Sequence, residues 1–363
     1  MKKIIILGST GSIGTQALEI IEANPDKFKV VGLVGNQNQE LLNSQAAAFG
    51  VPAANTVIGA EAAVRLIEDT EADVVINGIT GSVGLMPTLA TLRTGKVLAL
   101  ANKESLIVGG RLVTEAAKVG QIVPVDSEHS ALAQSLLAGS PNEVAKLILT
   151  ASGGPFRGYS KAQLSKVTPA QALKHPTWTM GKVVTTNSAT MVNKGLEIIE
   201  AHLLFNIPFD RIAVTVHPQS VVHSMVEFID GSIIAQCSPP DMKLPIALGM
   251  TWPDRVPNIS KPVDFTQSHT WQFEPLDEEV FAAVRLAREV GSKGFTYPAV
   301  YNAANEQAVE AFHKNKIGFL EIVDIINATV QAHQPESTLS IESVLAAEAW
   351  ARGFANQLIE AKN

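Results

Sequence analysis

Asp126 and Glu128 are the residues whose types and spacing first suggest metal chemistry. They follow the apolar run 121–125, and residues two apart in extended backbone project to the same side. Two carboxylates that point together repel unless they share a proton or a cation, and Mg²⁺ or Mn²⁺ prefers oxygen ligands. The alternative is the acidic first turn of a helix that begins near His129, where Asp and Ser are good caps. Spacing alone favours that helix start over a metal site.

A second group of polar residues, in the segment 187–197, could bind an anion. If a helix begins here, Ser188 lies at its N-terminus, and Asn193 and Glu197 share one face four residues apart. With Lys194, the segment offers a cation, a neutral donor and an acid within a mostly apolar helix. The alternative is ordinary polar decoration of an exposed helix.

Two loops add candidate contacts for a substrate. The segment 152–154, Ser-Gly-Gly, follows a predicted strand at 146–151 and offers a hydroxyl and backbone amides, a composition that also suits a plain turn. The loop 175–181 places Trp178 between proline and glycine, as in loops that close over active sites, although a Trp that anchors the loop is the alternative. The histidines of the β-rich segment 217–223 are interpreted as structural.

The start of the chain predicts a dinucleotide site. Residues 8–14 read Gly-Ser-Thr-Gly-Ser-Ile-Gly, follow a predicted strand at 4–7 and open a helix. Glycines there let the backbone approach a pyrophosphate at the helix N-terminus, and a structural turn is the alternative. The second strand ends at 34–38 without the carboxylate that holds the ribose of NAD, which favours NADP. No Arg or Lys is present at 34–38 to pair with its 2′-phosphate.

Composition restricts the class of protein. The chain has 363 residues, with 28 Lys and Arg against 35 Asp and Glu, a formal net charge of −7; 46% are hydrophobic and 17% charged. These values predict about two domains with packed cores and argue against disorder and nonspecific nucleic-acid binding. No apolar run approaches the ~18 residues that span a bilayer, and the run 4–7 predicts a strand, not a signal peptide. One cysteine, Cys237, excludes a disulfide framework, and we expect a cytoplasmic protein.

Hydrophobic patterns predict the elements that must position these residues. Helices alternate with β-rich runs, which predicts an α/β fold with an N-terminal Rossmann-like, doubly wound parallel sheet; the runs are 2–7, 29–34, 72–77, 96–101 and 121–125. A central α+β region contains a hairpin signal at Asp230-Gly231, and the sequence beyond Leu276 has the spacing of a helical bundle. The predicted domains are 1–125 for the dinucleotide, 126–255 for catalysis, a linker 256–275, and a helical domain 276–363.

Several strings, taken together, resemble the 1-deoxy-D-xylulose 5-phosphate reductoisomerase family. They are LGSTGSIG, ALANKES, VDSEHSA, ASGGPFR, HPTWTMG, ATMVNKGLE, HPQSVVHSMV, PPDMKLPI and NAANE, in the family's order and over nearly the whole chain. The resemblance implies rearrangement and reduction of this sugar phosphate to 2-C-methyl-D-erythritol 4-phosphate in non-mevalonate isoprenoid synthesis. It also implies NADPH, a divalent metal (Mg²⁺, Mn²⁺ or Co²⁺) and a homodimer, with no nucleic-acid or membrane partner.

The resemblance also implies residue roles. The metal ligands would be Asp126, Glu128 and Glu197, and the catalytic residues would be Lys103, Glu128 and His175. The substrate would contact Lys103, Ser127, Glu128, Ser152, His175, Trp178, Ser188, Asn193, Lys194 and Glu197, with Ser152, Ser188, Asn193 and Lys194 around its phosphate. The NADPH site would be lined by Thr10, Gly11, Ser12, Ile13, Gly35, Asn36, Gln37, Asn38, Asn102, Glu104 and Gly181. Residues 175–180 would form the closing loop, with Trp178 over the substrate.

Two departures from the family pattern concern the cofactor. Gln37 stands where a basic or small residue is common, and Asn36 where glycine is usual, which weakens the expected hold on the 2′-phosphate. The stretch 45–73 is shorter than the family norm.

Rival functions lack their own signals. A short-chain dehydrogenase needs Tyr-x-x-x-Lys, and none of the tyrosines has a lysine four residues later. A semialdehyde dehydrogenase needs an activated cysteine, and Cys237 has no helix N-terminus or base nearby in sequence to activate it. The rival of another class is a catalytically inactive NADP-binding regulator, which metal-dependent turnover would exclude.

Overall fold

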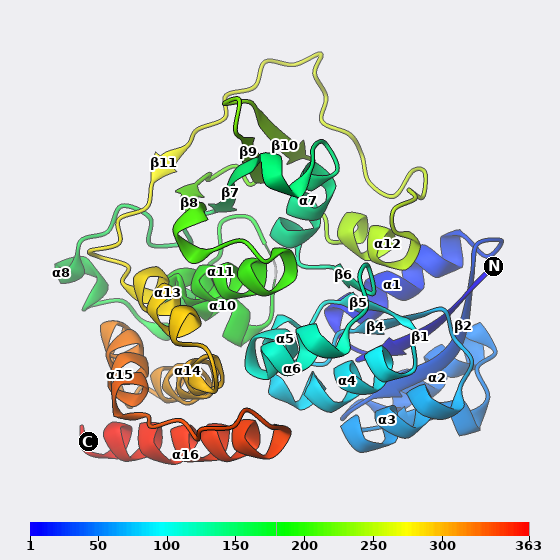
Figure 1. Ribbon diagram of the computed structural model, residues 1–363, viewed down its shortest axis with the longest axis horizontal. Coiled ribbons are helices and arrows are strands. Elements are labelled where there is room, and N and C mark those ends of the chain that lie inside the picture. The colour runs from blue at the N-terminus through cyan, green and yellow to red at the C-terminus, as the bar shows by residue number, and fades with distance from the viewer. Residues whose placement is uncertain (179, 363) are drawn as a thin grey trace. The chain divides into compact units, whose positions relative to one another are not determined.

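The computed structural model describes residues 1–178 and 180–362 (Figure 1). Within these residues, the first sheet has six parallel strands in the order β3-β2-β1-β4-β5-β6. The strand order reverses at β1, as in doubly wound sheets, where ligands bind beyond the carboxyl ends of the strands. The predicted parallel sheet is therefore confirmed. Its strands are β1 (Lys2–Leu7), β2 (Phe28–Gly35), β3 (Thr56–Ile58), β4 (Val74–Asn77), β5 (Val97–Leu100) and β6 (Ile122–Pro124).

Helices cover both faces of this sheet because alternate residues of β1 are buried on opposite sides. Ile4 and Ile6 pack in a core with residues of α1, α2 and α12, whereas Ile5 and Leu7 pack in a core with residues of α3 and α4. The helices of this part are α1 (Ser12–Ala23), α2 (Gln39–Phe49), α3 (Ala60–Asp69), α4 (Leu85–Arg93), α5 (Lys103–Gly109), α6 (Arg111–Ala116), α7 (Ser127–Leu136) and α12 (Lys243–Thr251).

The chain divides into two compact units. The first contains residues 1–106, 113–133 and 241–263, and the second contains 107–112, 134–240 and 264–363. Helix α12 thus packs with the first unit, although it lies within the segment 126–255 that the sequence assigns to catalysis. The predicted domain boundaries remain predictions, since a compact unit and a functional domain are defined differently.

The second unit contains a mixed sheet in the order β10-β9-β7-β8-β11. Strands β7 and β8 pair in parallel, whereas β9 is antiparallel to both β7 and β10, so the predicted partly antiparallel region is confirmed. The hairpin at Asp230-Gly231 is also present: Gly231 has φ +85°, and Asp230 Oδ1 accepts from Ser232 N at 2.9 Å. The strands are β7 (Val144–Ala151), β8 (Ile212–Val216), β9 (Val222–Phe228), β10 (Ile233–Cys237) and β11 (Glu274–Pro275).

Helices form the remainder of the second unit, and the helical C-terminal region is confirmed. Between Trp252 and Phe273, all of which are described, the backbone forms neither helix nor strand. No helix within the described part of the chain is long and apolar enough to cross a membrane. The helices are α8 (Lys161–Leu164), α9 (Pro169–Ala172), α10 (Lys182–Thr190), α11 (Val192–Phe205), α13 (Ala283–Lys293), α14 (Tyr297–His313), α15 (Phe319–Ala332) and α16 (Ile341–Glu360).

Candidate active site

Asp126 and Glu128 lie at the start of α7 and not in the extended backbone that the spacing argument assumed. Strand β6 ends at Pro124 and α7 begins at Ser127, so the helix start is the correct backbone interpretation. The helical turn still brings an oxygen of Asp126 within 4.8 Å of an oxygen of Glu128. Ser127 Oγ donates to Glu128 Oε2 at 2.6 Å, which fixes the orientation of this carboxylate.

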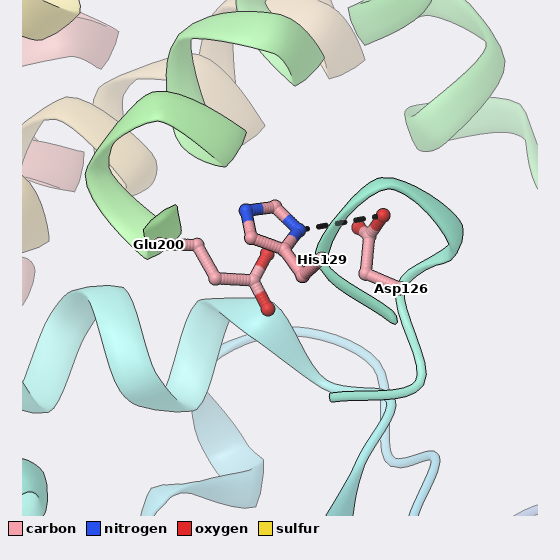
Figure 2. Close-up of side chains that lie close together, drawn as sticks. All are labelled: Asp126, His129 and Glu200. Carbon is pink, nitrogen blue, oxygen red and sulfur yellow. Dashed lines mark ion pairs between the residues drawn. The ribbon is translucent and has the colours of Figure 1, made fainter. Parts of the chain in front are cut away.

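The Asp126 carboxylate is held by two cationic or potentially cationic groups of the same unit. Lys103 Nζ forms an ion pair with Oδ2, and His129 Nδ1 lies 3.6 Å from Oδ1 (Figure 2). Burial raises the pKa of Asp126, but Lys103 and His129 together outweigh it and hold this pKa well below its usual range. Asp126 is therefore ionised near neutral pH and suited to bind a cation.

His129 is a neighbour of the predicted ligands that sequence reasoning did not single out. It is fully buried, and its signal in the sequence was its place one helical turn after Asp126. Figure 2 also draws Glu200, a fully buried carboxylate of α11. Sequence reasoning missed this residue too, although it follows Glu197 by three residues, about one helical turn.

The glycine-rich loop between β1 and α1 has the close backbone packing that a dinucleotide site requires. Gly8 has φ +76°, and a Cβ at Gly14 would lie 2.4 Å from Gly8 O. Gly11 is the N-cap of α1 and provides no side-chain cap, so the N–H groups of the first turn are left for an anion. Ser9 Oγ is buried and has no hydrogen-bond partner among the described residues, which adds a polar atom to this loop.

The predicted adenosine-side residues lie where β2 passes into α2. Gly35 ends β2 and pairs with Ile58 of β3, while Asn36 and Gln37 are exposed. Asn38 is the N-cap of α2 and accepts from Leu41 N at 3.0 Å. The short strand β3 was not predicted.

Asn102 and Glu104 flank the start of α5. Asn102 is buried, donates to the backbone oxygens of Ile79 and Gly81, and accepts from Ser105 N at 2.7 Å. Its side chain therefore fastens the loop after β4 to α5, and Glu104 lies in the first turn of that helix.

In the second unit, Ser152 and His175 form a hydrogen-bonded pair. His175 Nδ1 accepts from Thr177 N at 3.1 Å and from Trp178 N at 2.9 Å, so a neutral ring carries its proton on Nε2. Nε2 then donates to Ser152 Oγ at 3.0 Å, and Gly154 N donates to the same oxygen at 3.1 Å. Ser152 Oγ accepts from both groups, which leaves its own proton for a ligand oxygen.

Ser188 lies in the last turn of α10, not at a helix N-terminus as predicted. The segment divides into two helices because Met191, at φ +63°, separates α10 from α11. The loop after β7 approaches this end of α10 closely, since a Cβ at Gly154 would lie 2.9 Å from Ser188 O. The structure thus brings the Ser152 loop and Ser188 together.

The first two turns of α11 carry a buried charged cluster. Asn193 Nδ2 and Lys194 Nζ both donate to the Glu197 carboxylate, one to each oxygen. The side chains of Lys194 and Glu197 are only 5% and 1% exposed, so these residues are not the polar decoration of an exposed helix. The shared face predicted for Asn193 and Glu197 is confirmed.

The loop 175–181 is partly described. Trp178 is half-buried with its ring centroid 6.2 Å from that of His223, Gly181 is the N-cap of α10, and Thr179 lies outside the described residues. His217 is structural as interpreted: Nδ1 lies 2.8 Å from Gln272 O, and Nε2 accepts from Val221 N and Val222 N at 3.1 Å.

Comparison with known proteins identifies the family. Family models described as 1-deoxy-D-xylulose 5-phosphate reductoisomerase match residues 4–57 and 52–110, the C-terminal domain of that family matches 122–205, and the DXP reductoisomerase C-terminal domain matches 237–354. Curated proteins named 1-deoxy-D-xylulose 5-phosphate reductoisomerase include one from Leifsonia xyli, 63% identical over 99% of both chains. Another, from Mycobacterium marinum, is 57% identical over 98% of this chain and 93% of its own.

Solved structures agree over the same length. The reductoisomerase of Zymomonas mobilis in complex with NADPH is 41% identical, covers 99% of both chains and superposes with a TM-score of 0.92. A DOX-P reductoisomerase in complex with NADPH, fosmidomycin and magnesium is 35% identical, covers 99% of this chain and 98% of its own, and also has a TM-score of 0.92. The chain therefore belongs to the 1-deoxy-D-xylulose 5-phosphate reductoisomerase family.

Proposed function

We propose that the protein rearranges 1-deoxy-D-xylulose 5-phosphate and reduces the product with NADPH to 2-C-methyl-D-erythritol 4-phosphate, in the presence of a divalent metal. The observation that carries this proposal is the buried Asn193–Lys194–Glu197 cluster, which follows directly on the end of α10 where the loop containing Ser152 and Gly154 approaches Ser188. Lys194 is a buried cation in this cluster, and a lysine ammonium group can bind a phosphate. The relatives that bind NADPH and magnesium support the same activity.

Three carboxylates are proposed to hold the metal: Asp126 and Glu128 of the first unit and Glu197 of the second. All three offer hard oxygen ligands, which suits Mg²⁺, Mn²⁺ or Co²⁺. The low pKa of Asp126 keeps one ligand ionised, and Ser127 orients Glu128 by a hydrogen bond. When bound, such a metal polarises a substrate carbonyl as a Lewis acid.

NADPH is proposed to bind along the carboxyl edge of the first sheet. The pyrophosphate would lie against Thr10, Gly11, Ser12 and Ile13, where the close packing of Gly8 and Gly14 leaves room for backbone contact. The adenosine would lie near residues 35–38, and the nicotinamide end near Asn102, Glu104 and Gly181. When bound, NADPH supplies the hydride for reduction.

The chain's own side chains are proposed to bind and orient the sugar phosphate. Ser152, Ser188, Asn193 and Lys194 would hold the phosphate, and this remote binding would position the reacting carbons. His175 would fix the proton of Ser152 through its Nε2 donor and, with Lys103, contact the substrate. Trp178 would cover the substrate when the loop closes, which excludes water.

A cytoplasmic homodimer is proposed as the working form. Among the described residues, strand β10 is an edge of its sheet with one side of its backbone unpaired, and its Ile233 and Ile234 are 50% and 40% exposed. Such an edge readily pairs with another chain, and a second copy is the partner that the family resemblance implies. Light scattering of the purified protein tests this, with a monomer mass as the contrary result.

The activity is tested by NADPH oxidation with 1-deoxy-D-xylulose 5-phosphate after chelation and re-addition of Mg²⁺ or Mn²⁺. We expect substrate-dependent oxidation that needs the metal and yields the branched product, identified by mass and NMR. NADPH binding without any turnover would favour an inactive regulator. Turnover that is unaffected by chelation would contradict the proposed requirement for a divalent metal.

A further inference from the structure

Helix α10 has a sequence that forms a helix poorly by itself. Its nine residues, KVVTTNSAT, include five β-branched side chains, which lose rotamer freedom in a helix. It is also shorter than the ~12 residues at which isolated helices become marginal in water. The position of α10 must therefore depend on tertiary contacts.

One of these contacts is a partly buried side-chain hydrogen bond to α14. Thr186 is fully buried, and its Oγ1 lies 2.7 Å from Nε2 of His313, the last residue of α14. The same Oγ1 lies 2.9 Å from Lys182 O and can give that oxygen its single proton. The arrangement that satisfies both contacts has His313 Nε2–H as the donor and Thr186 as the acceptor.

Helix α10 joins two parts of the proposed substrate site. It begins directly after the loop 175–181, and its last turn contains Ser188, half a turn beyond Thr186. A shift of α10 would therefore move both Ser188 and the C-terminal end of the closing loop.

We propose that His313 is a positioning residue: through Thr186 it holds α10 so that Ser188 meets the phosphate of the substrate. This inference rests on the proposed function. His313 itself is proposed to touch neither substrate nor cofactor. Burial, and then the positive charge of Lys182, lower the pKa of His313, so the ring is neutral at neutral pH and adds no charge to the helix.

The test compares KM with kcat in variants that remove or restore the donor. His313→Leu and Thr186→Val should each raise KM for 1-deoxy-D-xylulose 5-phosphate about two- to tenfold, the range of one net hydrogen bond. The kcat should stay within about twofold, because saturating substrate restores the bound geometry. His313→Gln, whose side-chain amide can still donate, should recover most of the loss, and the double variant should be no worse than either single variant.

The chain offers a matched control in the same unit. Thr296 Oγ1 lies 2.8 Å from His333 Nε2, and both residues are buried, so the same chemistry occurs without α10. His333→Leu should lower thermal stability and leave KM unchanged.

Three results would overturn the positioning role: an unchanged KM in both His313→Leu and Thr186→Val, an equal loss in His313→Gln, or an equal rise in His333→Leu. If His313→Leu fails to fold, Thr186→Val decides, since valine keeps the shape of the buried side chain. A wild-type protein that does not turn over this substrate would overturn the proposed function and this inference with it. An active wild type with unaffected variants would overturn only the positioning role.

Discussion

Replacing Lys194 by methionine tests the buried cluster of α11 most sharply, because methionine has a similar volume and lacks the charged ammonium group. In the folded protein Lys194 Nζ donates to the Glu197 carboxylate, and the two side chains are 5% and 1% exposed. The substitution therefore has two separate consequences. It leaves Glu197 as a buried carboxylate that still accepts a hydrogen bond from Asn193, and it removes the proposed cation for the phosphate.

Both consequences have an expected size. Removing one partner of a buried ion pair typically costs about 3–5 kcal/mol in the free energy of unfolding, and the Asn193 hydrogen bond should keep the loss near the lower end. Losing a charge-assisted hydrogen bond to the phosphate corresponds to about 1.5–3 kcal/mol, roughly a 10- to 150-fold rise in KM.

Urea unfolding of the protein without ligands measures the first effect, and steady-state kinetics measure the second. The double variant Lys194→Met/Glu197→Gln should recover much of the lost stability, because no buried charge then lacks its partner. In binding, the loss should be confined to the phosphorylated substrate and absent for 1-deoxy-D-xylulose. An unchanged free energy of unfolding, or an equal loss of affinity for both sugars, would refute this reasoning.

Three further predictions use other parts of the chain. Gly14→Ala should weaken NADPH binding by at least about tenfold in a titration, because its Cβ would lie 2.4 Å from Gly8 O, whereas Gly353→Ala, with open space around it, should have no effect. Gln37→Arg should tighten NADPH about tenfold and leave NADH unchanged, more so at low salt; equal tightening of both would show that residue 37 does not face the 2′-phosphate. Burial lowers the pKa of His333 below 6.5, so the unfolded chain takes up a proton first as the pH falls. Stability to urea should therefore decrease below pH ~6.5, and less so in His333→Leu; an identical pH dependence in both proteins would exclude His333 as its source.

The parallel sheet could be predicted because its buried strands are continuous apolar runs, and their alternate residues face two separate cores. Strand β3 could not, because none of its three residues is buried and no apolar run marks it, whereas the equally short β6 lies within the apolar run 121–125. The packing of α12 with the first unit could not be predicted either, because Lys243–Thr251 is distant in sequence from the helices it packs with.

In the candidate site, the residue types were predictable and the backbone was not. The break between α10 and α11 falls at Met191 in a left-handed conformation, with neither Gly nor Pro to mark it, so Ser188 was placed at the wrong end of a helix. Asp126 and Glu128 follow the predicted strand 121–125 so closely that the metal hypothesis placed them in extended backbone, whereas the favoured alternative, a helix start, is what the structure shows. The direction of the Ser152–His175 hydrogen bond depends on two backbone donors to Nδ1, which no spacing rule reveals.

The most direct test of the proposed function is the Mg²⁺ dependence of NADPH oxidation by 1-deoxy-D-xylulose 5-phosphate in Glu197→Gln. A suitable control is Glu227→Gln, which changes a partly buried carboxylate of the same unit, 3.9 Å from Lys146 Nζ. We predict that Glu197→Gln keeps NADPH affinity and loses on the order of 10²-fold or more in metal-dependent turnover, while Glu227→Gln behaves as the wild type. Near-normal turnover of Glu197→Gln at low metal would contradict the assignment of Glu197 as a metal ligand.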